Sequence, residues 1–222
     1  MLPRMPIFPL SVVLFPGATL PLHIFEPRYR RMLADCLAGD RRFGITPAGS
    51  GQEAPDPGAV GCLAEVRVNQ ELPDGRSNIV VMGGMRFVIR RLLPDAAPYY
   101  VAAVETFDDE AGSDPPDDRV VRLREVFLQY QELQRHLNDL EPGEVELPAD
   151  GLSLSFHAAA AADCDAAIKL RLLAERSTAQ RVEALLLLLP VLTSATERAL
   201  DVHRRAHTNG KGGAQSGLAT GS

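Results

Sequence analysis

The sequence predicts an α+β protein with a β-rich first half and a helical second half. Short alternating apolar segments separated by turn residues fill residues 1–107, whereas apolar residues recur at helical spacing after residue 119. An acidic, proline-containing stretch, "DDEAGSDPPDD" (108–118), lies between the two patterns. The chain has 222 residues, 45% of them hydrophobic, which is enough for one large domain or two small ones with a packed core.

The first half contains several short strand candidates, and their number predicts a small barrel or a strongly bent sheet. Proline cannot donate a backbone hydrogen bond, so we expect the first two strands to lie at edges or bends. The candidates span residues 6–10, 19–25, 42–46, 60–72 and 99–107, together with the strand that follows the turn at 73–76.

The segment 60–72 is the clearest strand, because apolar and polar residues alternate along it. "PDGR" (73–76) then predicts a turn, since Pro73 fixes φ and Gly75 accepts a positive φ. The return segment completes an antiparallel hairpin. Within it, Gly83 and Gly84 indicate a bulge or a close approach of another backbone.

One helix interrupts the strands. Pro27 occupies a position that tolerates proline at a helix start, and Gly39 ends the helix. Between them an apolar stripe predicts a buried face, and Arg31 can pair with Asp35 at i, i+4. The stripe comprises Tyr29, Met32, Leu33, Cys36 and Leu37.

The acidic stretch 108–118 is predicted to be a solvated linker, followed by a helical subdomain at 119–206. A first helix extends to about residue 139, Asp150 caps a short helix, and residues 165–176 form a third. Ser177 with Gln180 has the spacing of a capping box and opens a long helix containing Pro190. The Gly/Ser-rich residues 207–222 predict a disordered tail.

Charge and composition exclude several classes of partner and location. The net charge is −6, with +1 on residues 1–107 and −7 on residues 108–222, so neither half offers the excess of positive charge that nucleic acids or anionic membranes require. The longest apolar run, residues 184–192, is too short to span a bilayer, and no signal-peptide pattern opens the chain. A cytoplasmic protein without a membrane or nucleic-acid partner is expected.

Catalytic and metal sites have little support in the sequence. A Ser-Lys dyad would have to use Lys169, which a solvated or helix-pairing role explains better. His203 and His207 have helical ligand spacing, but they lie where a helix end favours cations. The three cysteines lack metal spacing, and no phosphate-binding loop is present. We therefore expect no catalytic residues, no metal and no cofactor.

The segment "LFPGATLPLHIFEPRYRRML" (14–33) is the strongest candidate for a site. His23 and Glu26 could act as acid and base, and Arg28 could pair with an acidic ligand. The competing interpretation is structural, because proline and glycine force turns and a carboxylate at a helix start is favoured by the helix dipole. The structural corner is favoured, and a binding role remains open.

Several motifs in order give this chain a resemblance to a known family. "MPIFPLSVVLFPGATLPLHIFEPRYRRML", "FGI", "VGCLAEV", "DGRSNIVVMGGMRFVI" and "YYVAAVE" resemble the N-terminal substrate-binding domain of Lon proteases, and the resemblance covers roughly residues 5 to 200. It implies a PUA-like bent β-barrel followed by an α-helical bundle. The signature residues and candidates for a binding corner are Pro16, Gly17, Pro21, His23, Phe25, Glu26, Pro27, Arg28, Tyr29, Arg86 and Phe87.

The resemblance also implies a function. Since no Walker A motif is present, the chain resembles a stand-alone Lon-type substrate-binding protein, which is non-catalytic and acts as an adaptor in protein quality control. Its expected partners are unfolded or tagged polypeptides and Lon or another protease, with a weak homodimer as a further partner. The alternatives are a PUA-like small-ligand or RNA-binding protein, and an enzyme that uses the His23–Arg28 corner.

Overall fold

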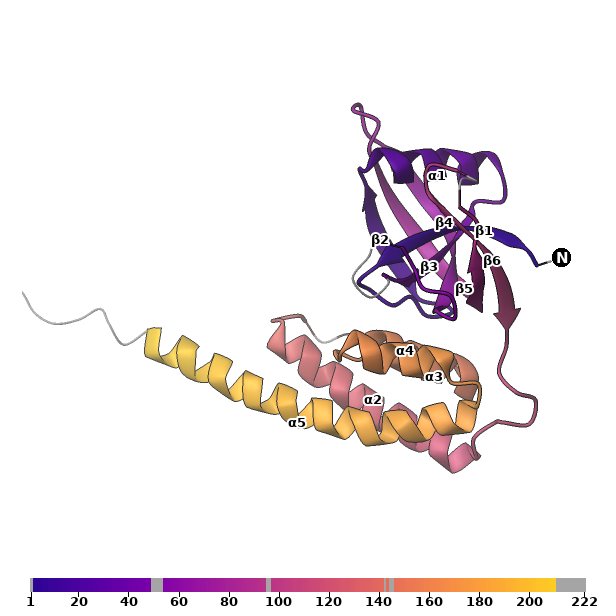
Figure 1. Ribbon diagram of the computed structural model, residues 1–222. Helices are drawn as coiled ribbons and strands as arrows, with labels where there is room; N and C mark the ends of the chain where they lie inside the picture. Colours follow the sequence, from indigo (N-terminus) through magenta and orange to yellow (C-terminus); the bar gives the residue numbers. More distant parts are fainter. Residues whose placement is uncertain (1, 49–53, 95–96, 142, 144–145, 211–222) are drawn as a thin grey trace, which may run out of the picture.

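The computed structural model describes residues 2–48, 54–94, 97–141, 143 and 146–210, with side chains described up to Val202. A β-barrel carrying one helix lies above a group of four helices, and a single extended connection joins the two (Figure 1). The predicted α+β class, with strands first and helices second, is confirmed.

Six strands build the barrel. Their spatial order is β2-β5-β4-β3-β1-β6, and a further pairing between β5 and β6 closes the ring. The long strand β5 makes this possible, because its first half pairs with β2 and β4 and its second half with β4 and β6. The strands are β1 (Arg4–Leu10), β2 (Thr19–Ile24), β3 (Arg42–Pro47), β4 (Val60–Glu71), β5 (Ser77–Leu92) and β6 (Tyr100–Phe107).

The two proline-containing strands take different places. β2 stands at the end of the sheet and, among the strands of the described residues, pairs with β5 alone. β1 lies between two strands, but Arg4–Ile7 pair with β6 and Ile7–Leu10 pair in parallel with β3. Each proline of β1 therefore has a ladder partner on one side only, which suits a residue without an N–H group.

The β4–β5 hairpin forms as predicted, with ladder irregularities between Cys62 and Ala64 and between Val66 and Val68. The interpretation of Gly83 as a close approach is confirmed. A Cβ atom there would overlap the carbonyl oxygen of Phe15. Gly83 also exchanges hydrogen bonds with the turn that precedes β2, accepting from Gly17 N at 2.9 Å and donating to Ala18 O at 2.8 Å.

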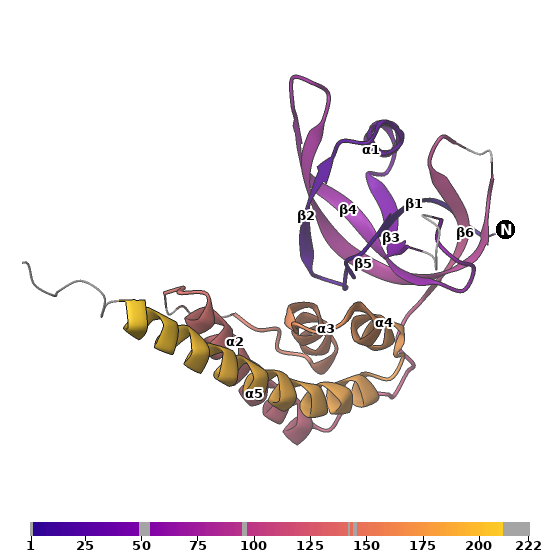
Figure 2. The same ribbon diagram turned by 60° about the vertical axis from the view of Figure 1, so that its left-hand side comes forward.

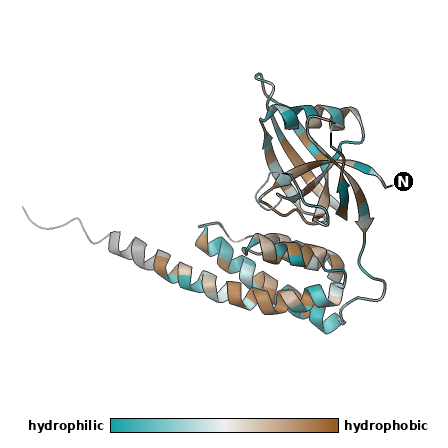
Figure 3. Ribbon diagram, viewed as in Figure 1, coloured by the Kyte–Doolittle hydropathy of each residue, from teal (hydrophilic) through white to brown (hydrophobic). Residues whose placement is uncertain are grey.

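The helix α1 (Pro27–Ala38) closes one end of the barrel (Figure 1). Its apolar stripe is buried, with Tyr29, Met32, Leu33 and Cys36 packed into the main core of the barrel. Arg31 and Asp35 pair on the solvent side at 2.9 Å, as their spacing predicts. Figure 3 shows hydrophilic and hydrophobic residues alternating along α1, whereas the barrel strands are mostly hydrophobic.

The helical half consists of α2 (Asp117–Leu137), α3 (Gly151–Ala161), α4 (Ala166–Ala174) and α5 (Thr178–Gly210). The predicted cap of α3 is present, since Asp150 Oδ1 accepts from Ser153 N at 2.7 Å. At the start of α5, Ser177 Oγ accepts from Gln180 N at 3.2 Å, which is one half of the predicted capping box. Ser177 N donates to Glu175 Oε1 at 2.7 Å, so Glu175 takes the place of the Gln180 side chain in the other half. The short helices α3 and α4 face the barrel, with α2 and α5 beneath them (Figures 1 and 2). Phe15 of the barrel packs into the helical core and so links the two halves.

The predicted start of the disordered tail, at residue 207, is wrong. α5 is helical through Gly210, so residues 207–210 belong to it. The reason is local, because no glycine or proline occurs between Pro190 and Gly210, and arginine and alanine favour a helix. The rest of that prediction, 211–222, lies outside the described residues. Among the described helices, none is both long enough and apolar enough to cross a lipid bilayer.

Candidate functional site

The structure distributes the predicted site residues over three places: the corner between β2 and α1, the turn before β2, and the strand β5. The first is the corner between β2 and α1, where His23 and Phe25 lie on the surface. His23 Nδ1 and Asn78 Oδ1 are 2.7 Å apart across the β2–β5 pair. The rings of His23 and Phe25 stack with their centroids 6.0 Å apart, and 58% of Phe25 is exposed. Pro21, earlier in β2, is also exposed.

At the start of α1, Arg28 is held by its neighbours. Its Nε atom donates to Glu26 Oε2 at 3.0 Å, and its guanidinium lies over the Tyr29 ring, 4.6 Å from the centroid. Tyr29 itself is buried, so this part of the corner is built into the barrel. Arg28 also lines a hollow of about 380 Å³ with Tyr99, Tyr100 and nearby prolines.

Pro16 and Gly17 are not part of that corner. They form the turn before β2, at the other end of the strand, where Gly17 adopts a φ of 76° that favours glycine. This turn faces the helical half and borders a cleft between the two halves.

Phe87 and Arg86 point to opposite sides of β5. Phe87 is fully buried in a barrel core with Ile7 and Ile89. Side chains at Gly44 and Gly61 would collide with its ring, so these glycines make room for it. Phe87 is therefore part of the packing. Arg86 is 3% exposed and turns toward the helices, so neither residue belongs to the β2–α1 corner.

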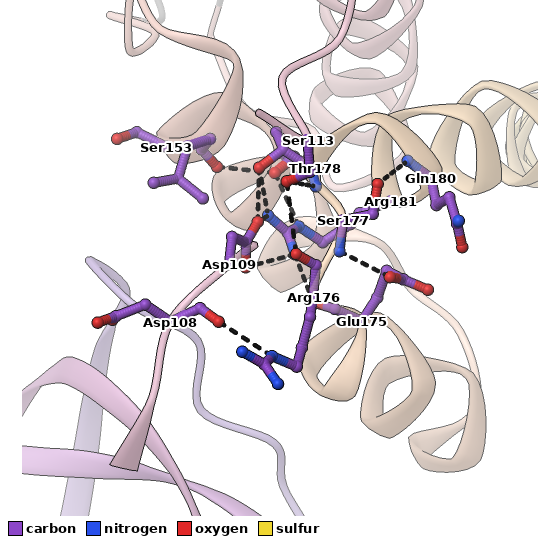
Figure 4. A network of polar contacts seen from close by, with 12 residues as sticks. Asp108, Asp109, Ser113, Ser153, Glu175, Arg176, Ser177, Thr178, Gln180 and Arg181 are labelled. Atoms are coloured by element: carbon purple, nitrogen blue, oxygen red, sulfur yellow. Dashed lines mark hydrogen bonds and ion pairs between the residues drawn. The ribbon is translucent and has the colours of Figure 1, made fainter. Parts of the chain in front are cut away.

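Arg86 belongs to a buried polar cluster that we call the joint, formed by Arg86, Asp109, Thr178 and Arg181. Asp109 pairs with both arginines. Arg181 Nη2 lies 2.5 Å from Asp109 Oδ2, and Thr178 Oγ1 donates to the same carboxylate (Figure 4). Arg181 is completely buried. Both guanidinium groups lie over the ring of Phe156, at 5.1 Å for Arg86 and 3.9 Å for Arg181.

Backbone carbonyl groups complete the joint. Arg86 Nη1 donates to Leu173 O at 2.8 Å and to Glu175 O at 2.6 Å, and Arg181 Nη1 donates to Glu175 O at 2.8 Å. Arg181 Nε further donates to Ser155 Oγ at 2.9 Å. These bonds satisfy the carbonyl groups of Leu173 and Glu175 at the C-terminal end of α4, where a helix leaves carbonyl groups without partners. The joint thus connects β5, the 108–116 segment, α3, α4 and α5.

Most of residues 108–118 are exposed, as expected of a solvated linker, but the joint corrects that interpretation at Asp109. The side chain of Asp109 is only 9% exposed, and α2 already begins at Asp117. Burial alone would raise the pKa of Asp109. The hydrogen bonds from Arg181 and Thr178, with the charges of both arginines, outweigh burial and hold the pKa below its usual value. A buried charge is stable there because two cations compensate it.

Sequence reasoning identified Arg86 but missed Asp109 and Arg181. One signal was available for Arg181. It precedes the apolar residues of α5 and shares their buried face, since Leu185 lies one turn further along. An arginine on such a face indicates a buried ion pair, although not its partner.

The cleft between the halves, which we call the interlobe cleft, is bordered by the signature residues Pro16 and Gly17. It consists of two adjoining parts of about 500 Å³ and 360 Å³ that share Ala18, Thr19 and Ala160. The segment Ser11–Leu20 lines its barrel side, and α3 with the start of α4 lines the other. Clefts between two structural units are frequent binding sites, and this one is mainly apolar.

A second apolar hollow, of about 470 Å³, lies between α4 and α5. Leu187 and Val191 border it and are 75% and 63% exposed. Val202 of the same helix is 67% exposed. Their spacing along α5 places the three side chains within one stripe of the helix surface.

The residues considered for catalysis are engaged elsewhere. Lys169, which would be the base of a Ser-Lys dyad, donates from its Nζ to Ala160 O at 3.0 Å. Burial raises the pKa of the Cys36 and Cys62 thiols to about 12, which keeps both protonated near neutral pH. Within the described ranges, no three His, Cys, Asp or Glu side chains gather as a metal site would need. The side chains of His203 and His207 lie outside those ranges.

Comparison with known proteins gives a family match over most of the chain. Residues 4–190 match the model of the ATP-dependent protease La (LON) substrate-binding domain. Lon proteases of Cytophaga hutchinsonii and Xanthomonas oryzae pv. oryzae are 32% and 28% identical over 111 and 140 residues. These alignments cover 47% and 60% of this chain but only 13% and 16% of the relatives, so the chain corresponds to a small part of their length.

Two solved structures share the fold. The Lon N-terminal domain protein from Xanthomonas campestris superposes with a TM-score of 0.62 at 24% identity, covering 83% of this chain and 97% of that one. The N-terminal domain of the Mycobacterium avium complex Lon protease gives 0.61 at 18% identity, covering 86% and 98%. At these identities the likeness establishes the arrangement of the elements.

Proposed function

The chain belongs to the ATP-dependent protease La (LON) substrate-binding domain family, and we propose that it is a non-catalytic module that recognises polypeptides. The substrates would be unfolded or tagged chains destined for degradation. The family description supports recognition of a substrate. The identity of that substrate, and the module's role as an adaptor, are our proposal.

The interlobe cleft is the observation that carries this proposal. It consists of two adjoining parts, is mainly apolar and is open to solvent, which suits an extended chain better than a compact metabolite. Leu152 is 39% exposed on one wall, and Val12 is 44% exposed on the other. An unfolded segment could cover such side chains, whereas a folded protein keeps its own apolar residues inside.

The charge of the cleft supports a polypeptide over a nucleic acid. Lys169 is the single lysine or arginine among its described lining residues, and its amino group already serves Ala160 O. Phosphate recognition needs several available cations. The small-ligand alternative would use the hollow beside Arg28, but Glu26 already engages that guanidinium at 2.9 Å.

The test is fluorescence anisotropy with labelled α-lactalbumin, both native and permanently unfolded by reduction and carboxymethylation. We expect binding of the unfolded form alone. Ala160→Arg places a long charged side chain in the part shared by both hollows and should weaken binding about tenfold or more, since apolar burial is lost. Ala38→Arg, at the exposed end of α1, is the matched control and should bind normally.

The proposal fails if no unfolded chain binds at tens of micromolar, or if native and unfolded forms bind alike. A protease is the second proposed partner, either Lon or another. If the chain acts as an adaptor, adding it to that protease should speed degradation of the unfolded probe, and Ala160→Arg should abolish the increase. No change in the degradation rate would leave a binding module without an adaptor role.

A weak homodimer remains a further proposal, and the exposed stripe of Leu187, Val191 and Val202 on α5 supports it. We expect sedimentation velocity to show concentration-dependent association that Leu187→Glu removes. Val121→Glu is the matched control, because Val121 is 56% exposed on α2. A chain that stays monomeric at all concentrations would remove the proposal.

A further inference from the structure

The strand β2 has one open side. It pairs with β5 through all six of its residues, and no other strand among the described residues pairs with it. The backbone groups that point away from β5 are therefore available to another chain. An open strand edge is a template for an added strand.

The register identifies those groups. Gly83 N donates to Ala18 O at 2.8 Å, so Ala18 and Gly83 stand opposite each other at a hydrogen-bonded position of the antiparallel ladder. The second bond of this position comes from the neighbouring Gly17 N, which donates to Gly83 O at 2.9 Å. The pairing continues in step through Leu20↔Val81 and Leu22↔Ile79. Because hydrogen-bonded residues alternate in such a ladder, Leu20, Leu22 and Ile24 bond to β5. Thr19, Pro21 and His23 direct their backbone groups to the open side.

Pro21 lies at the middle of this open edge. It has no N–H group, so the edge presents three carbonyl groups but only the two N–H donors of Thr19 and His23. Proline is tolerated in a strand where its nitrogen faces away from the partner, and Pro21 meets that condition. Its presence weakens the edge as a template without closing it.

The surroundings of the edge suit an extended chain with alternating apolar residues. Leu20 and Leu22 are half-buried on the side of the barrel core, so part of each faces the position of an added strand. At the start of β2, Thr19 and Leu20 also border the interlobe cleft. A chain seated on the edge would thus continue into the apolar cleft, where further side chains can be buried.

We propose that the open edge of β2 captures an extended segment of the substrate polypeptide as an additional strand. This inference rests on the proposed function and names the mode of recognition. The occupant is an extended backbone, because the carbonyl acceptors of Thr19, Pro21 and His23 repeat every second residue, about 6.8 Å apart, as the ladder of another strand requires. The N–H donors of Thr19 and His23 lie two such steps apart and fit the same ladder. Recognition through the backbone depends little on sequence, as a module that serves many unfolded chains requires.

Residue-resolved amide exchange tests the geometry. The full chain is followed by NMR with and without carboxymethylated α-lactalbumin. The amides of Leu20, Leu22 and Ile24 should be protected in the free protein. Those of Thr19 and His23 should exchange rapidly there and become protected in the complex. Protection confined to the helices would overturn the proposal.

A substitution that adds a donor gives the complementary test. Pro21→Ala supplies the missing N–H on the open side and removes no hydrogen bond within the barrel. We expect the affinity for the same probe to rise about two- to tenfold, as one added hydrogen bond predicts. Pro57→Ala, in an exposed loop, is the matched control and should leave the affinity unchanged.

The outcomes separate this inference from the proposed function. If no unfolded probe binds, the proposed function fails and the inference with it. If the probe binds while the Thr19 and His23 amides and the Pro21→Ala affinity stay unchanged, recognition occurs elsewhere and only the inference is overturned. If Pro21→Ala associates with itself and gains no affinity for the probe, the edge binds a second copy, which also overturns it.

Discussion

The β2–α1 corner and the joint contain the same chemistry in different surroundings. At the corner, Arg28 pairs with Glu26 beside Tyr29, and the two charged side chains are 28% and 40% exposed. In the joint, Arg86 and Arg181 pair with Asp109 against Phe156, and these charged groups are 3%, 0% and 9% exposed. The difference is access to water, which decides how much each pair contributes.

Water stabilises the ions of the corner whether or not they pair. The net contribution of an exposed ion pair is therefore small. The ions of the joint have lost most of their hydration and depend on one another, so removing one leaves the rest uncompensated. The corner attracts attention in the sequence, but the joint is the place where a single substitution should be most damaging.

Among the substitutions that test this comparison, Asp109→Ala should lower the free energy of unfolding the most. It leaves Arg86 and Arg181 buried side by side without a carboxylate, which we expect to cost about 3–5 kcal/mol in the free energy of unfolding. Urea denaturation followed by circular dichroism measures the loss. Asp114→Ala is the control, because Asp114 is an exposed aspartate of the same segment outside the joint. A decrease in the free energy of unfolding below about 1 kcal/mol would show that Asp109 contributes no more than an exposed ion pair does.

The pH dependence of the joint should be the next largest effect. The pKa of Asp109 is lower in the folded protein than in the unfolded chain. Its contribution is therefore complete above the unfolded value of about 3.9 and is lost as the pH falls through the folded value. The stability gap between wild type and Asp109→Asn should narrow below pH about 4. An equal gap from neutral to acidic pH would contradict this account.

Glu26→Gln should have the smallest effect. The pair with Arg28 is solvated, so the free energy of unfolding should fall by no more than about 1 kcal/mol, and added salt should reduce even that difference. The same urea experiment at low and high salt measures it. A loss comparable with that of Asp109→Ala would show that the corner stabilises the barrel as strongly as the joint does.

Most of the fold could be predicted because its signals are local. Alternation along residues 60–72, the turn at Pro73–Gly75, the stripe of α1 and the caps Asp150 and Ser177 each involve neighbours in sequence. The joint has one such signal, the place of Arg181 on the buried face of α5. Its pairing has no local signal, since the charges come from β5, the connecting segment and α5. Likewise, the open edge of β2 becomes visible only when the register with β5 is known.

The joint also has a consequence for how the molecule folds. Arg86 is synthesised well before Arg181, and its carboxylate partner Asp109 lies between them in the chain. Before the helical half has formed, Arg86 of the barrel lacks the contacts with the end of α4 that bury it in the complete protein. We therefore expect the two halves to unfold in one cooperative transition, and a fragment ending after β6 to be less stable than the barrel within the whole chain. The barrel and the helical half are separate in outline, but thermal unfolding should show a single transition for both.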